Sequence, residues 1–451
     1  MSVDNPSPRI GFDLNWYISA TIVHPPSAVP STYTEIQTPQ RASFLMIART
    51  LTSSLATLAL VSAARAQTKP EVHTRKLPAV FSEHADAFTS PGSVVPLLDG
   101  SVIVSDIMDG VVKRIDFTRP DAIALGRTGS GPGEYRFPAA VFQVPGDSVW
   151  ILDMGNFRWL PMHVNGRFGA PVSLSRAPRV LTNGSVLGTD SRCRLYARVE
   201  DAAAATKGSG STGQSTVIRA DRTSWRIDTI GRLMEPKGRI VITKSEGAGY
   251  TRTVDNRPLW AEDAVAVLPT GDVALVRSAD YHIDWVRSNG QRESSRPFAF
   301  VRSRVDEAEK QAYLTSTIRP GGILVVRDGS APKPNRQERR PPPVAMTAAD
   351  ASKYTWPPYL PPFTRSTIVS PMGRIWIERR LPQSVAVRSY DVVDSSGELI
   401  ERVEMPKSLR VAAVGREAVY VIRADEDDLQ FVRRYEWREM TPTPVSRARK
   451  E

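Results

Sequence analysis

Residues 126–168 read GRTGSGPGEYRFPAAVFQVPGDSVWILDMGNFRWLPMHVNGRF and contain one complete sheet-building unit. A Gly/Pro-rich loop leads into an apolar run, a tight turn at residues 145–147 and a second apolar run. An Asp-x-x-Asn-x-Arg loop and a third apolar segment follow. Short apolar runs bounded by Pro, Gly, Asn and Asp are typical of β-strands joined by tight turns. The rest of the chain resembles looser copies of this unit.

Tight-turn signals recur along the chain and predict its repeat. Asp99-Gly100 between two apolar runs indicates a hairpin, with positive φ expected at both turn positions. The first two intervals between turns are both 46 residues, and the longer ones of 79 and 102 residues are explained by extra loops and an insertion at residues 303–360. A fixed period of this size predicts β-propeller blades. The six turns lie at Gly100, Gly146, Arg192, Gly271, Gly373 and Gly415.

The last unit offers only three strands, so the ring needs a strand from elsewhere to close. Residues 72–81 (VHTRKLPAVF) are expected to supply it by pairing with the blade that contains Val419. The insertion differs in composition from the blades. Ser303 and Asp306 predict a capping box before a helix, and an Arg/Pro-rich stretch precedes a second capping box at Thr347 and Asp350.

The GRTGSGPGEY run and the blade GDSVWILDMGNFR together resemble the NHL-like six-bladed β-propellers of secreted bacterial proteins. Asp153, Asn156 and Arg158 match the NHL pattern D-x-x-N-x-R residue by residue. The resemblance covers about residues 70–437 and implies an all-β fold of six four-stranded antiparallel blades. The other units keep the hydrophobic framework of the family without this signature.

The N-terminal region indicates export. Residues 46–66 read as a signal peptide, with a basic start at Arg49, an apolar centre and a small-residue cleavage site at residues 64–66. We expect translation to begin at Met46, with residues 1–45 a non-native or disordered leader. The mature chain would hold a propeller at residues 67–437 and a disordered basic tail at residues 438–451. We therefore predict a periplasmic or extracellular protein without a membrane span.

Composition narrows the functional classes. The formal net charge is +11, but the arginines are spread along the chain instead of gathered in a groove-reading motif, so we expect no nucleic-acid partner. Cys193 is the single cysteine and excludes an intrachain disulfide. The loop GRTGSGPG lacks the Lys-Ser/Thr ending of a phosphate loop, and no paired histidines or G-x-S-x-G elbow occur. We predict no metal and no cofactor.

Strand parity predicts where a site would lie. If the turns between first and second strands lie on one face, the turns between second and third strands and the connections between blades all lie on the other. That face would carry the glycine loop and the insertion, and polar residues at its end of the inner strands would line the channel mouth. These candidates for an anionic ligand are Arg136, Arg179, Glu262, Asp263, Arg365 and Arg410.

Each candidate also has a structural interpretation. Arg136 could pair with Glu134, and other arginines could pair between blades. The insertion could be a lid that carries Trp356, Tyr359 and Phe363 over the channel, or a surface decoration whose aromatics pack on their own blade. We expect structural roles for three further residues, since Asp and Asn cap tight loops and Arg can bridge to Asp. These are Asp153, Asn156 and Arg158.

The sequence favours a non-catalytic binding or scaffold module that holds an anionic small molecule, a glycan or a peptide, and a protein partner at the cell surface stays open. The alternative is a metal-dependent, lactonase-like hydrolase or lyase. That chemistry needs at least three oxygen ligands converging in the channel. Only Glu262, Asp263 and Gln143 could begin such a site.

Overall fold

The computed structural model describes residues 72–145, 147–178, 181, 185–200, 213–236, 240–244, 251–255, 257–318, 352 and 354–439. All of them belong to one compact unit. The predicted leader and signal peptide, at residues 1–66, lie outside the described residues, as does the Arg/Pro-rich stretch with the second predicted capping box.

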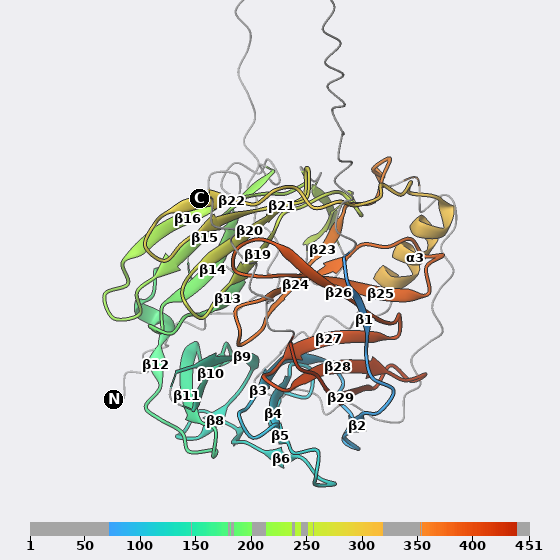
Figure 1. The fold of residues 1–451 in the computed structure, drawn as a ribbon. Helices are drawn as coiled ribbons and strands as arrows, with labels where there is room; N and C mark the ends of the chain where they lie inside the picture. Colours follow the sequence, from blue (N-terminus) through green and yellow to red (C-terminus); the bar gives the residue numbers. More distant parts are fainter. Residues whose placement is uncertain are drawn as a thin grey trace, which may run out of the picture. The chain divides into compact units, whose positions relative to one another are not determined.

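The structure is a β-propeller of six antiparallel blades, which confirms the predicted fold class (Figure 1). We name the blades A to F in chain order. Blade A contains β3 (Pro91–Pro96), β4 (Val102–Asp106), β5 (Val111–Ile115) and β6 (Ile123–Ala124). Blade B contains β9 (Pro138–Val144), β10 (Ser148–Asp153), β11 (Arg158–His163) and β12 (Val172–Ser173). Blade C contains β13 (Ser185–Thr189), β14 (Leu195–Glu200), β15 (Gln214–Ala220) and β16 (Ile227–Met234).

The remaining blades follow the same order. Blade D contains β19 (Ala264–Val267), β20 (Val273–Arg277), β21 (His282–Val286) and β22 (Arg292–Ser294). Blade E contains β23 (Phe363–Val369), β24 (Ile375–Arg379), β25 (Val387–Val393) and β26 (Leu399–Pro406). Blade F contributes β27 (Leu409–Val414), β28 (Ala418–Ala424) and β29 (Gln430–Glu436) from its own stretch of chain.

The first strands of the six blades form the inner ring. They contact one another in the cyclic order β3, β9, β13, β19, β23, β27 and back to β3. Hydroxyl groups join some of these strands: Thr189 Oγ1 donates to Gln143 O at 2.9 Å, and Thr367 Oγ1 donates to Val265 O at 2.8 Å. Between blades A and B, Val141 N donates to Ser93 Oγ at 3.1 Å. These bonds satisfy backbone groups at sheet edges that would otherwise be unpaired.

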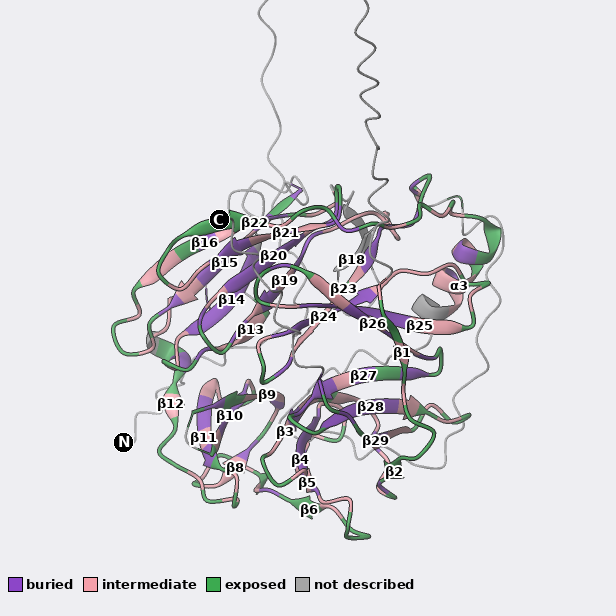
Figure 2. Ribbon diagram, viewed as in Figure 1, coloured by how far each residue is buried: buried purple, intermediate pink, exposed green. Residues whose placement is uncertain are grey.

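The second strand of a blade lies in its middle, and in most blades it is buried along almost its whole length. β4, for example, is fully buried, and so are the first four residues of β20 and of β24 (Figure 2). Such a strand is covered on both faces by neighbouring blades, which explains its almost uninterrupted apolar sequence. Large aromatic side chains fill the spaces between blades, and Trp159, Trp285 and Trp376 are each at most 1% exposed. Side-chain packing between blades therefore forms the core.

Two N-terminal segments, not one, join the ring. β2 (Ser82–Glu83) pairs antiparallel with β29 and completes blade F, which confirms closure by an N-terminal strand. The predicted strand within residues 72–81 was assigned to the wrong blade, because β1 (Thr74–Lys76) pairs in parallel with β26 and adds a fifth strand to blade E. Arg75 explains the preference, since it pairs with buried Glu401 at 2.9 Å and stacks 3.6 Å from the Trp437 ring.

The turn at Asp99-Gly100 has a different geometry from the one predicted. Gly100 N donates to Leu97 O at 3.1 Å, and only Gly100 has positive φ, at 83°. Four residues therefore make the turn, and a left-handed fourth residue leads into the next strand. Gly271 and Gly373 occupy the same position in blades D and E, with φ of 86° and 76°. In blade C this position holds Cys193, at φ 55°.

Additional elements connect the blades. The glycine loop contains the parallel pair β7 (Arg127–Thr128) and β8 (Glu134–Tyr135), and a 3-10 helix, Leu174–Arg176, follows blade B. The hairpin β17 (Ile240–Lys244) and β18 (Thr251–Asp255) lies between blades C and D in the sequence. The insertion contains helix α3 (Glu307–Ile318). Asp306, not Ser303, caps α3, because Asp306 Oδ1 accepts a hydrogen bond from Glu309 N at 3.0 Å.

Candidate functional site

We call the top face the one that carries the turns between second and third strands and the connections between blades. On this face, contacts within the protein hold the glycine loop, the GRTGSGPGEY run, in place. Glu134 Oε2 accepts a hydrogen bond from Gly131 N at 2.7 Å, and Arg127 pairs with Glu134 Oε1 at 2.8 Å. These hydrogen bonds lower the pKa of Glu134. Arg127, not Arg136, is thus the partner of Glu134, because the parallel pairing of β7 with β8 places residues 127 and 134 side by side.

Asp153 anchors this loop to blade B. Its carboxylate is fully buried and accepts hydrogen bonds from Arg136 N, Phe137 N and Asn156 N, at 3.1 to 3.3 Å. It also accepts from Asn156 Nδ2 at 2.7 Å and from Arg158 Nε at 3.2 Å. The carboxylate therefore binds the turn of its own blade to the incoming connection. This agrees with the structural role expected for the D-x-x-N-x-R residues.

Glu262 lies at the top end of blade D between two arginines. Its Oε2 is 3.4 Å from Arg365 Nε and 3.8 Å from Arg198 Nη2. Arg198 is buried, donates to Ser215 Oγ at 2.9 Å and also pairs with Glu235. The Arg365 side chain is 43% exposed and that of Glu262 is 28% exposed. The structure thus joins two predicted site residues, Glu262 and Arg365, in a charge cluster that solvent can reach.

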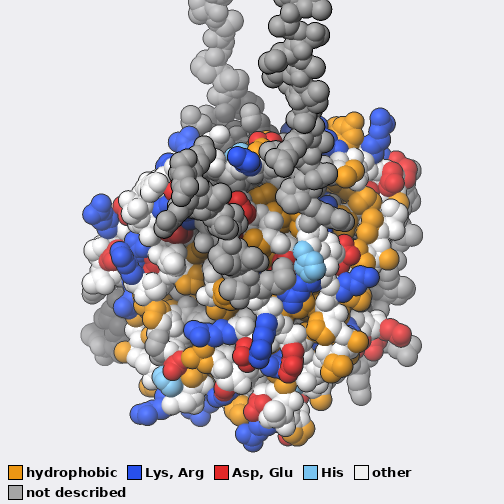
Figure 3. Space-filling model, in the orientation of Figure 1, with side chains coloured by type: hydrophobic (Ala, Val, Ile, Leu, Met, Phe, Trp, Pro, Cys, Tyr) orange, Lys and Arg blue, Asp and Glu red, His pale blue; other side chains and the backbone are white. Residues whose placement is uncertain are grey.

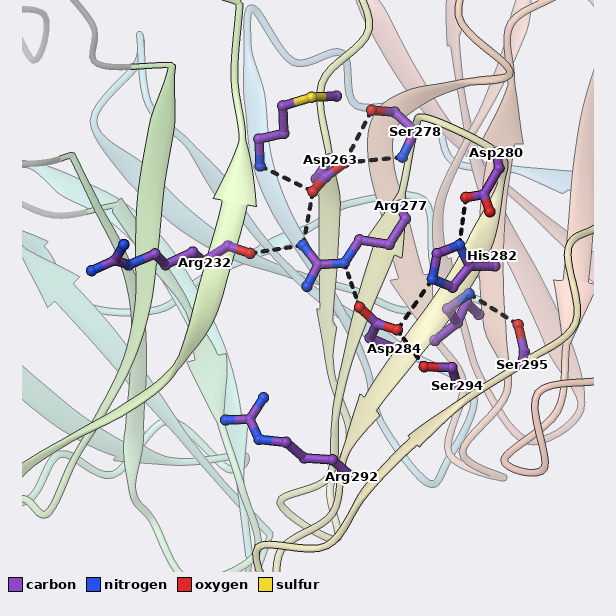
Figure 4. A network of polar contacts seen from close by, with 12 residues as sticks. Arg232, Asp263, Arg277, Ser278, Asp280, His282, Asp284, Arg292, Ser294 and Ser295 are labelled. Atoms are coloured by element: carbon purple, nitrogen blue, oxygen red, sulfur yellow. Dashed lines mark hydrogen bonds and ion pairs between the residues drawn. The ribbon is translucent and has the colours of Figure 1, made fainter. Parts of the chain in front are cut away.

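Asp263 follows Glu262 in the chain, but its carboxylate is bound by groups of the protein itself (Figure 4). It is 3% exposed and accepts hydrogen bonds from Met234 N at 2.9 Å and from both Ser278 N and Ser278 Oγ at 2.9 and 3.0 Å. Arg277 Nη1 pairs with it at 2.8 Å. These contacts between blades C and D use all of the hydrogen-bond accepting capacity of the Asp263 carboxylate. As a ligand-binding residue Asp263 is therefore not supported.

Arg410 lies on β27, next to β23 with Arg365, and both side chains are exposed at the same end of the inner ring. Arg410 has no ion-pair partner among the described residues. Arg136 is also exposed, and its backbone N–H is bound by Asp153 just before the top end of β9. Arg179 lies outside the described residues. Three of the four predicted arginines thus lie at the top end of inner strands.

The aromatic residues of the insertion divide into three environments. Trp356 packs edge-on against Tyr313 of α3, with ring centroids 5.7 Å apart, and against Tyr354 at 5.6 Å. Tyr359 is 41% exposed. Phe363 is 2% exposed and belongs to the core between blades D and E, so it cannot be part of a lid. Among the described residues, the aromatic packing of the insertion agrees better with a structural decoration than with a lid.

A hydrogen bond joins helix α3 to blade E. Glu309 is 3% exposed and accepts a hydrogen bond from Gln383 N at 2.5 Å. The nearby guanidinium of Arg380 is largely buried, and this burial lowers its pKa despite the opposing charges of Glu378 and Glu309. The hydrophobic pattern of the sequence could not indicate this polar contact, because Gln383 is 74 residues away from Glu309.

The residues proposed for a metal site do not converge. Glu262 and Asp263 lie at the top end of β19, whereas Gln143 lies near the bottom end of β9, next to the turn that follows Val144. No group of three or more metal-binding side chains is present within the described ranges. The oxygen ligands named for a lactonase-like enzyme are therefore on opposite ends of the channel.

His282 belongs to a polar network that was not among the candidate sites taken from the sequence (Figure 4). Its Nδ1 is 2.5 Å from Asp280 Oδ1, and its Nε2 is 3.1 Å from Asp284 Oδ1. Asp284 also binds Arg277 at 2.7 Å. Burial alone would raise the pKa of Asp284, but hydrogen bonds from Ser294 and Arg277 outweigh it and lower the pKa. The alternation Asp-x-His-x-Asp was visible in the sequence, since alternate residues of a strand share a face.

Positively and negatively charged side chains are interspersed on the face shown in Figure 3. Across the described residues most buried or half-buried arginines have carboxylate partners, such as Arg402 with Asp391 at 2.8 Å. We find no helix in the described part of the chain that could cross a membrane.

Comparisons with known proteins concern the fold. No family model matches the chain. Two curated relatives, UPF0301 proteins from two strains of Caulobacter vibrioides, are 34% identical over 74 residues, or 16% of this chain and 35% of theirs. The chain thus spans about a third of the length of the curated relatives that it matches.

Among solved structures, virginiamycin B lyase from Staphylococcus aureus has 10% identity and a TM-score of 0.36, with 79% of this chain and 98% of that chain covered. The calcium-binding protein regucalcin from Agrobacterium tumefaciens has 9% identity and a TM-score of 0.37, with 82% and 98% covered. A DUF4221 family member from Bacteroides vulgatus has 11% identity and a TM-score of 0.42, with 82% of this chain and 99% of that chain covered. The structural neighbours are six-bladed β-propellers, and at these identities no activity carries over to this chain.

Proposed function

We propose that this chain is an exported, NHL-like β-propeller that binds an anionic ligand at the channel mouth of its top face and acts as a binding or scaffold module. The observation that carries the proposal is the pair Arg365 and Arg410. They lie on contacting inner strands, at the same end, with exposed side chains, and Arg365 also pairs with Glu262 at 3.4 Å. Guanidinium groups bind carboxylates, phosphates and sulfates through paired hydrogen bonds.

The proposal is tested by titrating the mature protein with citrate and with sulfate at constant ionic strength, because salt alone screens surface charges. We expect saturable binding by calorimetry. Arg365→Ala and Arg410→Ala should each weaken it about tenfold or more, as loss of a charge-assisted hydrogen bond does. Arg226→Ala is the matched control, because Arg226 is 81% exposed and lies by the turn before β16, on the opposite face.

Equal loss of affinity in Arg226→Ala would mean that net charge alone attracts the anions and would contradict the proposal. One tightly bound divalent metal ion per chain, together with hydrolysis of a lactone, would instead support the lactonase-like alternative. Export is tested separately by sequencing the N-terminus of the secreted protein, which we expect at Gln67. An N-terminus upstream of Met46 would contradict the proposed signal peptide.

A further inference from the structure

A shallow groove of about 520 Å³, widely open to solvent, lies between blades D and E on the bottom face, opposite the channel mouth. Its walls come from the turn between β21 and β22 with the adjoining Glu293 of β22, and from the turn between β25 and β26, with Asp272 from the turn before β20. All of its lining residues are polar or charged. They are Asp272, Arg287, Ser288, Asn289, Gln291, Glu293, Ser395 and Ser396.

Arg287 is the cation of this groove and is fully engaged. Its Nη2 pairs with Glu293 at 2.9 Å and donates to Ser395 O at 3.0 Å. Its Nη1 is 3.4 Å from Asp272, and its guanidinium stacks 4.5 Å from the Trp285 ring. Arg287 therefore joins blade D to blade E and leaves no positive charge for a ligand. With Asp272 and Glu293 as carboxylates, the lining has one excess negative charge.

The alternation of β22 turns Glu293 toward the groove. The flanking residues point the other way: Arg292 donates to Ile230 O of blade C at 2.7 Å. Ser294 donates to Asp284 at 2.6 Å (Figure 4). Since successive side chains of a strand lie on opposite faces, Glu293 faces blade E. Its side chain is 43% exposed.

Several polar groups of the groove have no hydrogen-bond partner among the described residues. They are the side-chain amide of Gln291, the Nδ2 group of Asn289 and the hydroxyls of Ser288 and Ser395. Amides and hydroxyls both donate and accept hydrogen bonds. Together with Glu293, whose Oε2 pairs with Arg287 and whose side chain is 43% exposed, they form a set of donors and acceptors around an open groove.

We propose that this groove is a second binding site and that it takes a neutral oligosaccharide. An anion is disfavoured by the excess carboxylate, and the groove lacks the apolar walls that most small-molecule pockets have. Sugar hydroxyl groups also donate and accept, so a saccharide can bind the amides, the hydroxyls and Glu293 at once. This ligand class differs from the anion proposed for the top face, and the two proposals can fail independently.

The test is calorimetric titration of the mature protein with maltohexaose, cellohexaose and chitohexaose. We expect at least one of them to bind and the double variant Gln291→Ala/Ser395→Ala to weaken that binding about tenfold or more. Neither side chain has a bonding partner among the described residues, so the variant should fold normally, which thermal unfolding checks. Arg410→Ala, on the other face, should leave saccharide binding unchanged.

Absence of heat from all three hexasaccharides at about 10 mM, well above a millimolar dissociation constant, would overturn the proposal. So would binding that the double variant does not weaken. Tetralysine is the competing probe: if it binds to the groove and Glu293→Gln abolishes this binding while no saccharide binds, the ligand class is cationic and the proposal is wrong.

Discussion

Cys193 shows how one residue can depart from a repeat without changing the fold. It occupies the left-handed position that glycine holds in blades A, D and E, at φ 55°. A side chain at positive φ brings Cβ close to the backbone and costs free energy. Cys193 also packs partly against the hydrophobic cluster of Trp150 and Trp159. The fold therefore accommodates a strained backbone at Cys193 together with the packing of its side chain.

We predict that Cys193→Gly has a free energy of unfolding about 0.5–1 kcal/mol higher than Cys193→Ala, because both lose the thiol and only glycine relieves the strain. Denaturant unfolding measures the difference. Gly100→Ala is the reciprocal control and should cost about 1 kcal/mol, since an added Cβ meets nothing nearer than Arg434 at 3.7 Å and only the φ angle opposes it. Equal stability of the two Cys193 variants would contradict the assignment of strain.

Buried carboxylates bind the incoming connection in several blades. Asp106 accepts hydrogen bonds from Thr89 N and Ser90 N, as Asp153 does from Arg136 N and Phe137 N. In each case a carboxylate near the end of a second strand holds the incoming connection. In blade D this role belongs to Asp263 at the start of the first strand. The sequence pattern could not separate such residues from channel ligands, because the residue type is the same and only the donors around it differ.

At the scale of elements, the closing segment is the most distinctive part of the ring. After β2, His84 N donates to Val432 O at 3.1 Å, and the imidazole is 2% exposed. Its Nδ1 accepts a hydrogen bond from Asp86 N at 3.1 Å, and its Nε2 has no partner among the described residues. Nδ1 must therefore be without a proton, and a charged ring would lose this bond. Burial lowers the pKa of His84 below its usual 6.5, although the charge of Asp86 opposes the shift.

We predict that His84 makes the protein less stable as the pH falls. A depressed histidine pKa means that the unfolded chain binds the proton more readily, so stability is lost from about pH 6.5 downward to the pKa of the folded state. His84→Gln, which can still accept from Asp86 N, should flatten this part of the profile. Melting temperatures of both proteins between about pH 7 and pH 5 measure the effect.

The difference between the two profiles isolates His84 from other groups. Glu439, for example, has a pKa raised by burial and acts in the opposite direction, but it is present in both proteins. Parallel profiles for the wild type and His84→Gln would contradict the prediction. Hydrogen exchange at residues 82–88 should locate the loss at the closing segment, because the amides of His84 and Phe88 donate to β29.

At the scale of the whole molecule, the propeller has two faces with different chemistry. The top face presents Arg365 and Arg410 at the channel mouth, and the bottom face presents a groove with one excess negative charge. The inner strands and the packed blades separate the two. Ligands with no common contact and no two-state element between them have no coupling free energy.

We predict that citrate at the channel mouth and an oligosaccharide in the groove bind independently. Saturation with one ligand should change the affinity for the other by less than about twofold, because no shared element transmits a difference. Titration of each ligand in the presence of the other measures this. A larger change in affinity would show that the blades move on binding and would contradict the rigid ring.

The sequence by itself determined the blade count, the turn positions and the character of each strand. These properties are local: Gly and Asp at tight turns and apolar runs at second strands depend on neighbours a few residues away. Strand parity also placed Arg136, Arg365 and Arg410 at one end of the inner ring, where the structure has them.

Only the tertiary structure decided which N-terminal strand pairs with which blade and which charged groups are already partnered. Glu83 reaches Arg423 across 340 residues of sequence, and Arg75 selects blade E through Glu401 and Trp437. Phe363 is core because blades D and E meet there, and Asp263 is saturated because blade C ends beside it. Contacts of this kind depend on the closure of the ring, which brings distant segments together and leaves no trace in local periodicity.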